Sequence, residues 1–164
     1  MSTTCDIALD YPASPELVWT MWLDDAFLDA KGSNTAESAH SIDIAGSTTR
    51  LTITRLIVEG IPPIAKTFLG DTITLQEVQT WGEPDAAGIR RAQVGLTVKN
   101  APATVTGSIT LSPTSMGTHV AIHFDIKVAV PLFGATAESV IKAQLENFIG
   151  AEHGIGLEWL ASHK

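Results

Sequence analysis

The most informative absences in this sequence of 164 residues concern cysteine, long apolar segments and positive charge. A single cysteine, Cys5, excludes a disulfide within the chain and is typical of proteins from a reducing compartment. No apolar run approaches the roughly 20 residues of a membrane span, and the first residues lack the basic and apolar regions of a secretory signal. We therefore expect a cytoplasmic protein with no integral membrane association.

Basic residues are also few, because 10 Lys and Arg stand against 18 Asp and Glu, for a net charge of −8. Nucleic acids and anionic membranes repel such a protein, so neither is expected as a partner. The length fits one domain, which we expect to span residues 1–164. The motifs G-x-S-x-G and H-E-x-x-H, glycine-rich phosphate loops and paired cysteines are missing, so we assign no catalytic residue, metal site or cofactor.

Apolar residues recur with a period of two from about residue 37 to residue 130. The clearest case is the segment 119–130, where they occupy every second position: Val120, Ile122, Phe124, Ile126, Val128 and Val130. Such alternation is typical of an antiparallel sheet with one face in water. Turn residues divide this region, and with an initial strand around Ile7 and Leu9 the pattern predicts about seven strands with short connections.

Two short helices are predicted between the first strand and the rest of the sheet. Ser14 can cap a helix that has Pro15 in its first turn, where the missing N–H costs nothing. A second helix restarts near Asp24 and ends near Gly32. The first of these helices contains two tryptophans, Trp19 and Trp22, in only a few residues.

A long amphipathic helix is predicted from about residue 136 to residue 161. At about 100° per residue its apolar side chains share one face, which has to cover an apolar surface. These side chains are Ile141, Leu145, Phe148, Ile155 and Trp159. Three glycines, Gly150, Gly154 and Gly156, each cost roughly 1 kcal/mol relative to alanine in a helix, which argues against a rigid, straight final helix.

The order of these elements resembles the START-like superfamily, the helix-grip fold of lipid-transfer domains, birch-pollen-type allergens and polyketide cyclases. The matching stretches are YPASPELVW, AFLDAK, TRLIVEGIPPIAKTFLGDTITLQEVQTW, VPLFG and EWL. More narrowly, the chain is similar to an uncharacterised, mainly actinobacterial family. The resemblance implies an α+β helix-grip fold. In this fold a curved antiparallel sheet wraps around a long C-terminal helix, and an apolar cavity lies between the sheet and the helix. The two short helices would close one end of that cavity, with Trp19 and Trp22 as the plug.

Candidate functional residues are those that interrupt or line the inward faces, since burying an unpaired charge costs several kcal/mol. The strand phases and the apolar helix face assign seven residues to the cavity: His40, Arg55, Glu77, Trp81, Phe148, Glu152 and Trp159. Two interpretations remain open for the charged ones. Arg55 pairs with Glu152 or Glu77 as a structural ion pair, or these groups orient the polar end of a ligand. A bulge that shifts the register would instead place Arg55 or Glu77 outside.

Three functions are compatible with this pattern. The first is non-enzymatic binding or carriage of a hydrophobic small molecule, such as a lipid or polyketide-like compound, with Arg55 favouring a ligand carboxylate. The second is a cyclase- or hydrolase-type enzyme in which Glu77, Glu152 or His40 acts as acid or base. The third is a protein-interaction module with a filled core, whose partner protein the sequence does not identify.

Three further features have simple structural interpretations. His119 and His123 lie roughly 13 Å apart on a strand, too far to share one metal ion, and are expected at the surface. Cys5 has the inward phase of the first strand and is expected to be a core thiol. The apolar segment 59–70 forms either a short helix across the sheet edge or a flap over the cavity mouth, hinged at Gly60 and Gly70.

Overall fold

A computed structural model describes residues 2–33 and 35–163 of the chain. Within these residues, seven antiparallel strands form one sheet in the order β1-β7-β6-β5-β4-β3-β2. The strands are β1 (Thr3–Tyr11), β2 (Glu37–Ala45), β3 (Thr48–Ile57), β4 (Ile73–Trp81), β5 (Arg90–Val98), β6 (Ala103–Thr114) and β7 (Gly117–Val128). The helices are α1 (Pro15–Trp22), α2 (Asp25–Lys31), α3 (Pro63–Leu69) and α4 (Gly134–Ser162).

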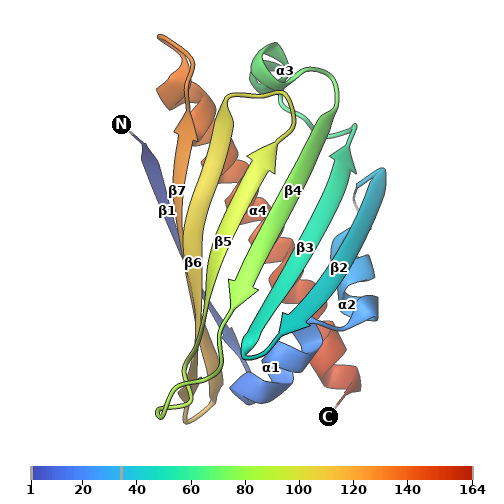
Figure 1. Cartoon of the computed structure of the whole chain (residues 1–164). Helices are drawn as coiled ribbons and strands as arrows, with labels where there is room; N and C mark the ends of the chain where they lie inside the picture. The colour runs from blue at the N-terminus through green and yellow to red at the C-terminus, as the bar shows by residue number, and fades with distance from the viewer. Residues whose placement is uncertain (1, 34, 164) are drawn as a thin grey trace.

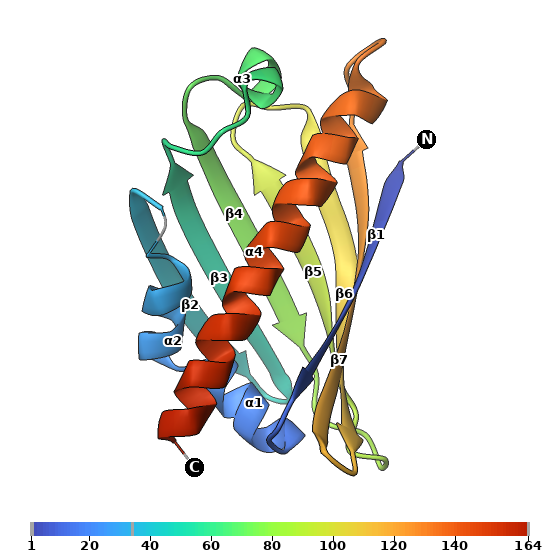
Figure 2. The ribbon, with the colours of Figure 1, turned by 180° about the vertical axis from the view of Figure 1, so that it is seen from behind.

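The sheet curves around α4, which crosses its inner face from end to end (Figure 1, Figure 2). Helices α1 and α2 lie at the C-terminal end of α4, and α3 lies near its N-terminal end. This is the helix-grip arrangement that the resemblance implies. The predictions of an antiparallel sheet, two short helices after the first strand and a long C-terminal helix are confirmed.

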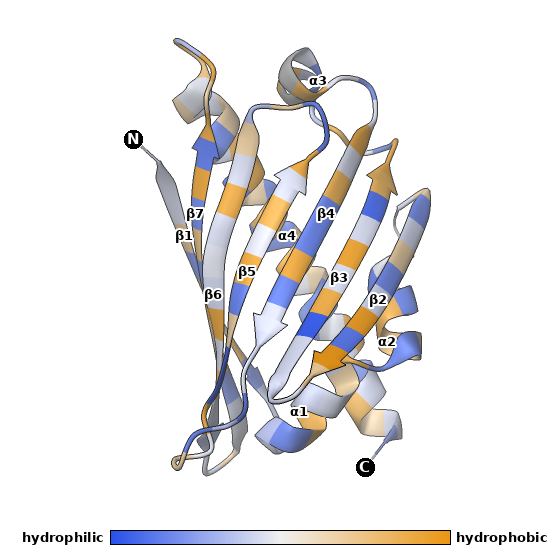
Figure 3. Ribbon diagram, viewed as in Figure 1, coloured by the Kyte–Doolittle hydropathy of each residue, from blue (hydrophilic) through white to orange (hydrophobic). Residues whose placement is uncertain are grey.

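Alternating hydropathy decides which face of each strand is buried, and Figure 3 shows the alternation along the central strands. In β7, Val120, Ile122 and Phe124 are buried towards α4, as the period of two predicts. His119 and His123 lie on the opposite face, where they bond Asp10 and Asp6 of the neighbouring β1 at 2.9 and 2.7 Å. The surface position of both histidines and the buried position of Cys5 are therefore confirmed.

The short helices begin where the sequence predicts. Ser14 Oγ accepts a hydrogen bond from the backbone N–H of Leu17 at 3.3 Å, and Pro15 occupies the first turn of α1. Asp24 caps α2 in the same way, through the N–H of Phe27 at 3.3 Å. These caps satisfy N–H groups that have no partner inside the helix, so the chain can turn sharply from β1 into two helices.

Aromatic rings fill the end of the molecule next to α1. Trp22 lies 5.7 Å from Trp81 and 6.5 Å from Tyr11, measured between ring centroids. Trp19 packs edge-on against Trp81 at 5.0 Å and carries the guanidinium of Arg90 over its other side at 4.3 Å. The two tryptophans of α1 thus close this end of the space between sheet and α4.

Helix α4 is unbroken through Gly150, Gly154 and Gly156. Its N-terminal part is fixed to the sheet by Glu138, which accepts hydrogen bonds from the N–H of Val128 at 2.9 Å and from Thr3 Oγ1 at 2.8 Å. The Val128 N–H is the main reason that the pKa of Glu138 lies below its ordinary value. Near the other end, Gly156 allows α4 to approach Tyr11 closely, since a Cβ there would lie 2.8 Å from Tyr11 Cε1.

The segment 59–70 contains the short helix α3, which confirms the helical interpretation, while its movement as a flap stays a prediction. Among the described residues, no group of three or more His, Cys, Asp or Glu lies close enough to hold a metal ion. In the same part of the chain, no helix has the length and apolar character needed to cross a membrane.

Candidate functional site

A cavity of about 580 Å³ lies between the inner face of the sheet and α4. Its lining residues extend from Trp22, the last residue of α1, to Leu69, the last residue of α3, and Ile61 just before that helix. Most of its wall is apolar and comes from the central strands and α4: Leu75, Leu96, Val105, Phe124, Ile141 and Leu145. This volume falls within the range of roughly 300–1,000 Å³ that is usual for small-molecule sites.

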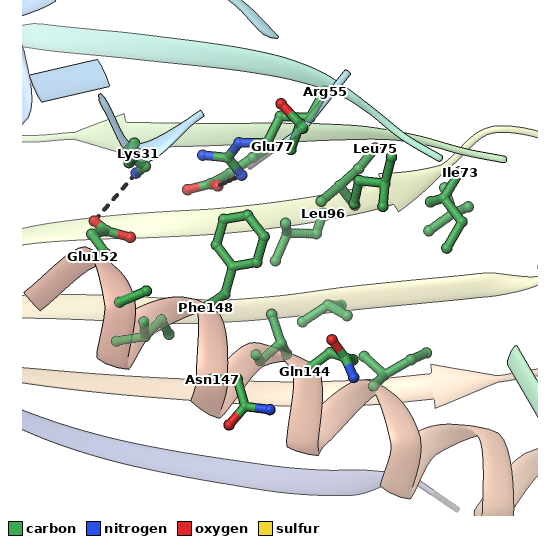
Figure 4. Close-up of a pocket in the computed structure, with 18 of the residues that line it drawn as sticks. Lys31, Arg55, Ile73, Leu75, Glu77, Leu96, Gln144, Asn147, Phe148 and Glu152 are labelled. Carbon is green, nitrogen blue, oxygen red and sulfur yellow. Dashed lines mark hydrogen bonds and ion pairs between the residues drawn. The ribbon is translucent and has the colours of Figure 1, made fainter. Parts of the chain in front are cut away.

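Five charged residues line the cavity, and one of them, Glu59 in the segment after β3, is exposed. The other four come from four elements, Lys31 from α2, Arg55 from β3, Glu77 from β4 and Glu152 from α4 (Figure 4). They form two ion pairs. Arg55 Nη1 lies 3.3 Å from Glu77 Oε1, and Lys31 Nζ lies 3.2 Å from Glu152 Oε1. Of the two partners that the sequence allows for Arg55, the structure selects Glu77. The β3–β4 register explains this choice, because Ile53 is opposite Glu77 and Arg55 is therefore its diagonal neighbour.

Glu77 belongs to a chain of hydrogen bonds along the inner face of β4. Its Oε2 accepts from Gln79 Nε2, and Gln79 Oε1 in turn accepts from Trp81 Nε1 at 2.9 Å. Burial raises the pKa of Glu77, but the charges of Lys31 and Arg55 and the hydrogen bonds outweigh it and hold the pKa below its ordinary value. A carboxylate that is held ionised in this way is a poor general acid near neutral pH.

Arg55 is almost fully buried, with 3% of its surface exposed. The ring of Phe148 on α4 lies against its guanidinium, 5.1 Å from ring centroid to Cζ. Nη1 faces Glu77, but Nε and Nη2 have no hydrogen-bond partner within the described part of the chain. Buried donors of this kind are rare in folded proteins and call for a partner.

Four of the seven residues assigned from the sequence line the cavity, namely Arg55, Glu77, Phe148 and Glu152. His40, Trp81 and Trp159 are not among its lining residues. His40 lies on the edge strand β2, which α2 covers instead of α4, and its Nε2 bonds Asp25 Oδ1 at 2.7 Å. Trp81 packs in the aromatic cluster at the closed end, and Trp159 Nε1 donates to Asp24 Oδ2 at 3.0 Å.

Sequence reasoning missed several polar residues of the site, among them Lys31 and Gln79. Lys31 lies in the last turn of α2, where a lysine usually stays in water and interacts with the helix dipole. Nothing in the sequence therefore indicated that this side chain is buried. Gln79 has the same strand phase as Glu77 and Trp81, and this phase could have identified it.

Comparison with known proteins now adds a family and a set of structural neighbours. Residues 6–160 match the model of a family described as "Protein of unknown function (DUF2505)". The chain belongs to this family. A comparison with curated proteins gives no match.

Solved structures show the same fold at low sequence identity. The Zhui aromatase/cyclase from Streptomyces sp. R1128 has a TM-score of 0.62 at 13% identity, covering 96% of this chain and 93% of that one. TTHA0849 from Thermus thermophilus has a TM-score of 0.61 at 16% identity, covering 95% and 98%. Ara h 8.0201 has a TM-score of 0.57 at 14% identity, covering 96% and 99%. At these identities the likeness shows a common helix-grip fold and nothing finer.

Proposed function

We propose that this protein binds or carries a hydrophobic small molecule, such as a lipid or polyketide-like compound, in the cytoplasm. The observation that supports the proposal is the cavity of about 580 Å³ between the sheet and α4, with its mainly apolar wall. Burial of apolar ligand surface there supplies roughly 25 cal/mol per Å², and a few polar groups then set orientation. The structural neighbours are consistent with this, since one is named as an aromatase/cyclase.

Binding without catalysis fits the polar groups better than an enzymatic role. Glu77 is held ionised by its neighbours, and Glu152 is paired with Lys31. The third candidate acid or base, His40, lies outside the cavity lining and is paired with Asp25. An interaction module with a filled core is also disfavoured, because the core contains the cavity.

The proposal is tested by filling the cavity from one strand. Leu75 on β4 points into the cavity, whereas its neighbour Gln76 is exposed on the opposite face (Figure 4). We expect Leu75→Trp to lower the affinity for the neutral apolar dye Nile red by about tenfold or more. Gln76→Trp is the matched control, which adds the same side chain outside and leaves the affinity unchanged.

Fluorescence titration of the dye measures both variants, and circular dichroism checks that each is folded. Native mass spectrometry of the freshly purified protein adds an independent readout, since a bound ligand appears as a non-covalent adduct that is lost on denaturation. A wild-type protein that binds no dye and carries no adduct would refute the proposal. Equal loss of affinity in both variants would place the dye elsewhere and have the same consequence.

A further inference from the structure

The feature that the fold does not explain is the unused part of the Arg55 guanidinium. A guanidinium carries five N–H donors, and here one nitrogen, Nη1, contacts Glu77 at 3.3 Å. Nε and Nη2 face no acceptor among residues 2–33 and 35–163, although only 3% of the arginine surface is exposed. Arg55 is one of the residues that line the cavity, so these two donors lie beside it, where neighbouring side chains cover them.

The two free donors form one recognition edge. Nε–H and Nη2–H lie on the same side of the planar guanidinium and run parallel, so they match the two oxygens of a carboxylate. The Nη1 contact with Glu77 and the Phe148 ring 5.1 Å away restrict the orientation of this plane. The edge is thus preorganised before any ligand enters.

The charges around the edge bear on how many negative charges a ligand can carry. Five charged residues line the cavity, and one of them, Glu59, is exposed. The other four, Lys31, Arg55, Glu77 and Glu152, form two ion pairs whose charges sum to zero. A single carboxylate disturbs this balance less than a phosphate monoester, which brings close to two negative charges.

We infer that the ligand is an amphipathic acid whose carboxylate is bound by Nε and Nη2 of Arg55. Its apolar body lies along the wall formed by Leu75, Leu96 and Ile73, on the side of Arg55 that faces away from Lys31 and Glu152 (Figure 4). The inference rests on the proposed function and adds the chemical class of the ligand. It also assigns a role to a buried cation that is only partly used by its ion pair.

Matched ligands test the inference, with decanoic acid, decanol, methyl decanoate and decyl phosphate competing against bound Nile red at neutral pH. These molecules share one apolar chain and differ in the head group. We expect wild-type protein to bind decanoic acid at least about tenfold more tightly than the other three. In Arg55→Lys the positive charge beside Glu77 is kept but the parallel donors are lost. There the preference for decanoic acid over decanol falls below about threefold.

A second variant covers the case in which Arg55→Lys does not fold. Arg55→Met combined with Glu77→Leu removes the ion pair as a whole, a change that is often tolerated because no lone charge stays buried. It is expected to show no preference for decanoic acid over decanol. Circular dichroism confirms folding of each variant before the competition is measured.

The possible results separate this inference from the proposed function. If the dye binds but decanoic acid is no better a competitor than decanol, the carboxylate inference is overturned and the apolar cavity stands. A preference for decyl phosphate, or a preference for the acid that persists in both variants, overturns it as well. If neither dye nor any of the four ligands binds, the proposed function itself fails.

Discussion

Three of the four glycines of α4, Gly150, Gly154 and Gly156, provide a sharp test of how closely this helix packs on the first strand. Each lies inside a helix, so replacement by alanine gains the same propensity, roughly 1 kcal/mol. Their surroundings differ. Gly150 and Gly154 are exposed, and a Cβ at either position meets no atom within 4 Å. At Gly156 a Cβ would lie 2.8 Å from Tyr11 Cε1 and 3.2 Å from Met21 Cε.

Tyr11 cannot easily move away from such a Cβ. Only 2% of its surface is exposed, and its ring is held edge-on by Trp22 at 6.5 Å and by His153 at 5.0 Å. Overpacking of this kind costs about 1–3 kcal/mol. Because the propensity gain is common to all three substitutions, Gly156→Ala should be less stable than Gly150→Ala by that amount.

Thermal and urea unfolding of the three variants measure the effect. Gly150→Ala and Gly154→Ala are expected to unfold above the wild type, and Gly156→Ala at or below it, with about 2–4 °C for each kcal/mol in a chain of this size. A Gly156→Ala protein as stable as the other two would show that α4 does not approach Tyr11 as described. No gain in Gly150→Ala or Gly154→Ala would contradict the propensity argument instead.

Three further predictions concern ionisable groups. Tyr11 is the only tyrosine in the sequence, and its burial raises its pKa above the ordinary value of 10.0. The native protein should therefore show no phenolate absorbance at pH 10, and a normal titration curve would contradict the buried position. Glu77 has a lowered pKa, so it contributes stability above pH 4.5, its ordinary pKa, and this stability is lost as the pH falls through the pKa of the folded state. Urea unfolding of Glu77→Gln should therefore show a weaker dependence of stability on acid pH than the wild type. The bond to Asp6 is the main reason that the pKa of His123 lies above 6.5, with Asp125 as a smaller cause. The stability that this pair contributes is present below pH 6.5 and is lost as the pH rises through the folded pKa; nuclear magnetic resonance titration should find the shift reduced in Asp6→Asn.

Local patterns predicted most of the fold. Alternation in the segment 119–130 identifies β7 and its buried face. Successive side chains of a strand point to opposite faces, so this pattern can be recognised from residues that are adjacent in the chain. Ser14 and Asp24 mark the helix starts for the same reason, since a cap bonds an N–H three residues further on. The inward phase of Arg55 and Glu77 also follows from their own strands.

The candidate site could be predicted only in part. Arg55, Glu77, Phe148 and Glu152 line the cavity, but His40 has a comparable strand phase and lies away from it. Strand phase tells which side of a strand a residue occupies and not which element covers that side. On the edge strand β2 the cover is α2, a result of how far α4 extends across the sheet.

The sequence by itself determined the order of the elements, their amphipathic faces and the presence of charges on those faces, because these depend on residues close in the chain. Tertiary structure decided which charges meet, since Lys31 reaches Glu152 across 121 positions. It also decided that Gly156 alone of the three glycines is closely packed, and that Arg55 keeps one free edge beside an open cavity. These outcomes depend on distances between elements far apart in sequence, which no local pattern records.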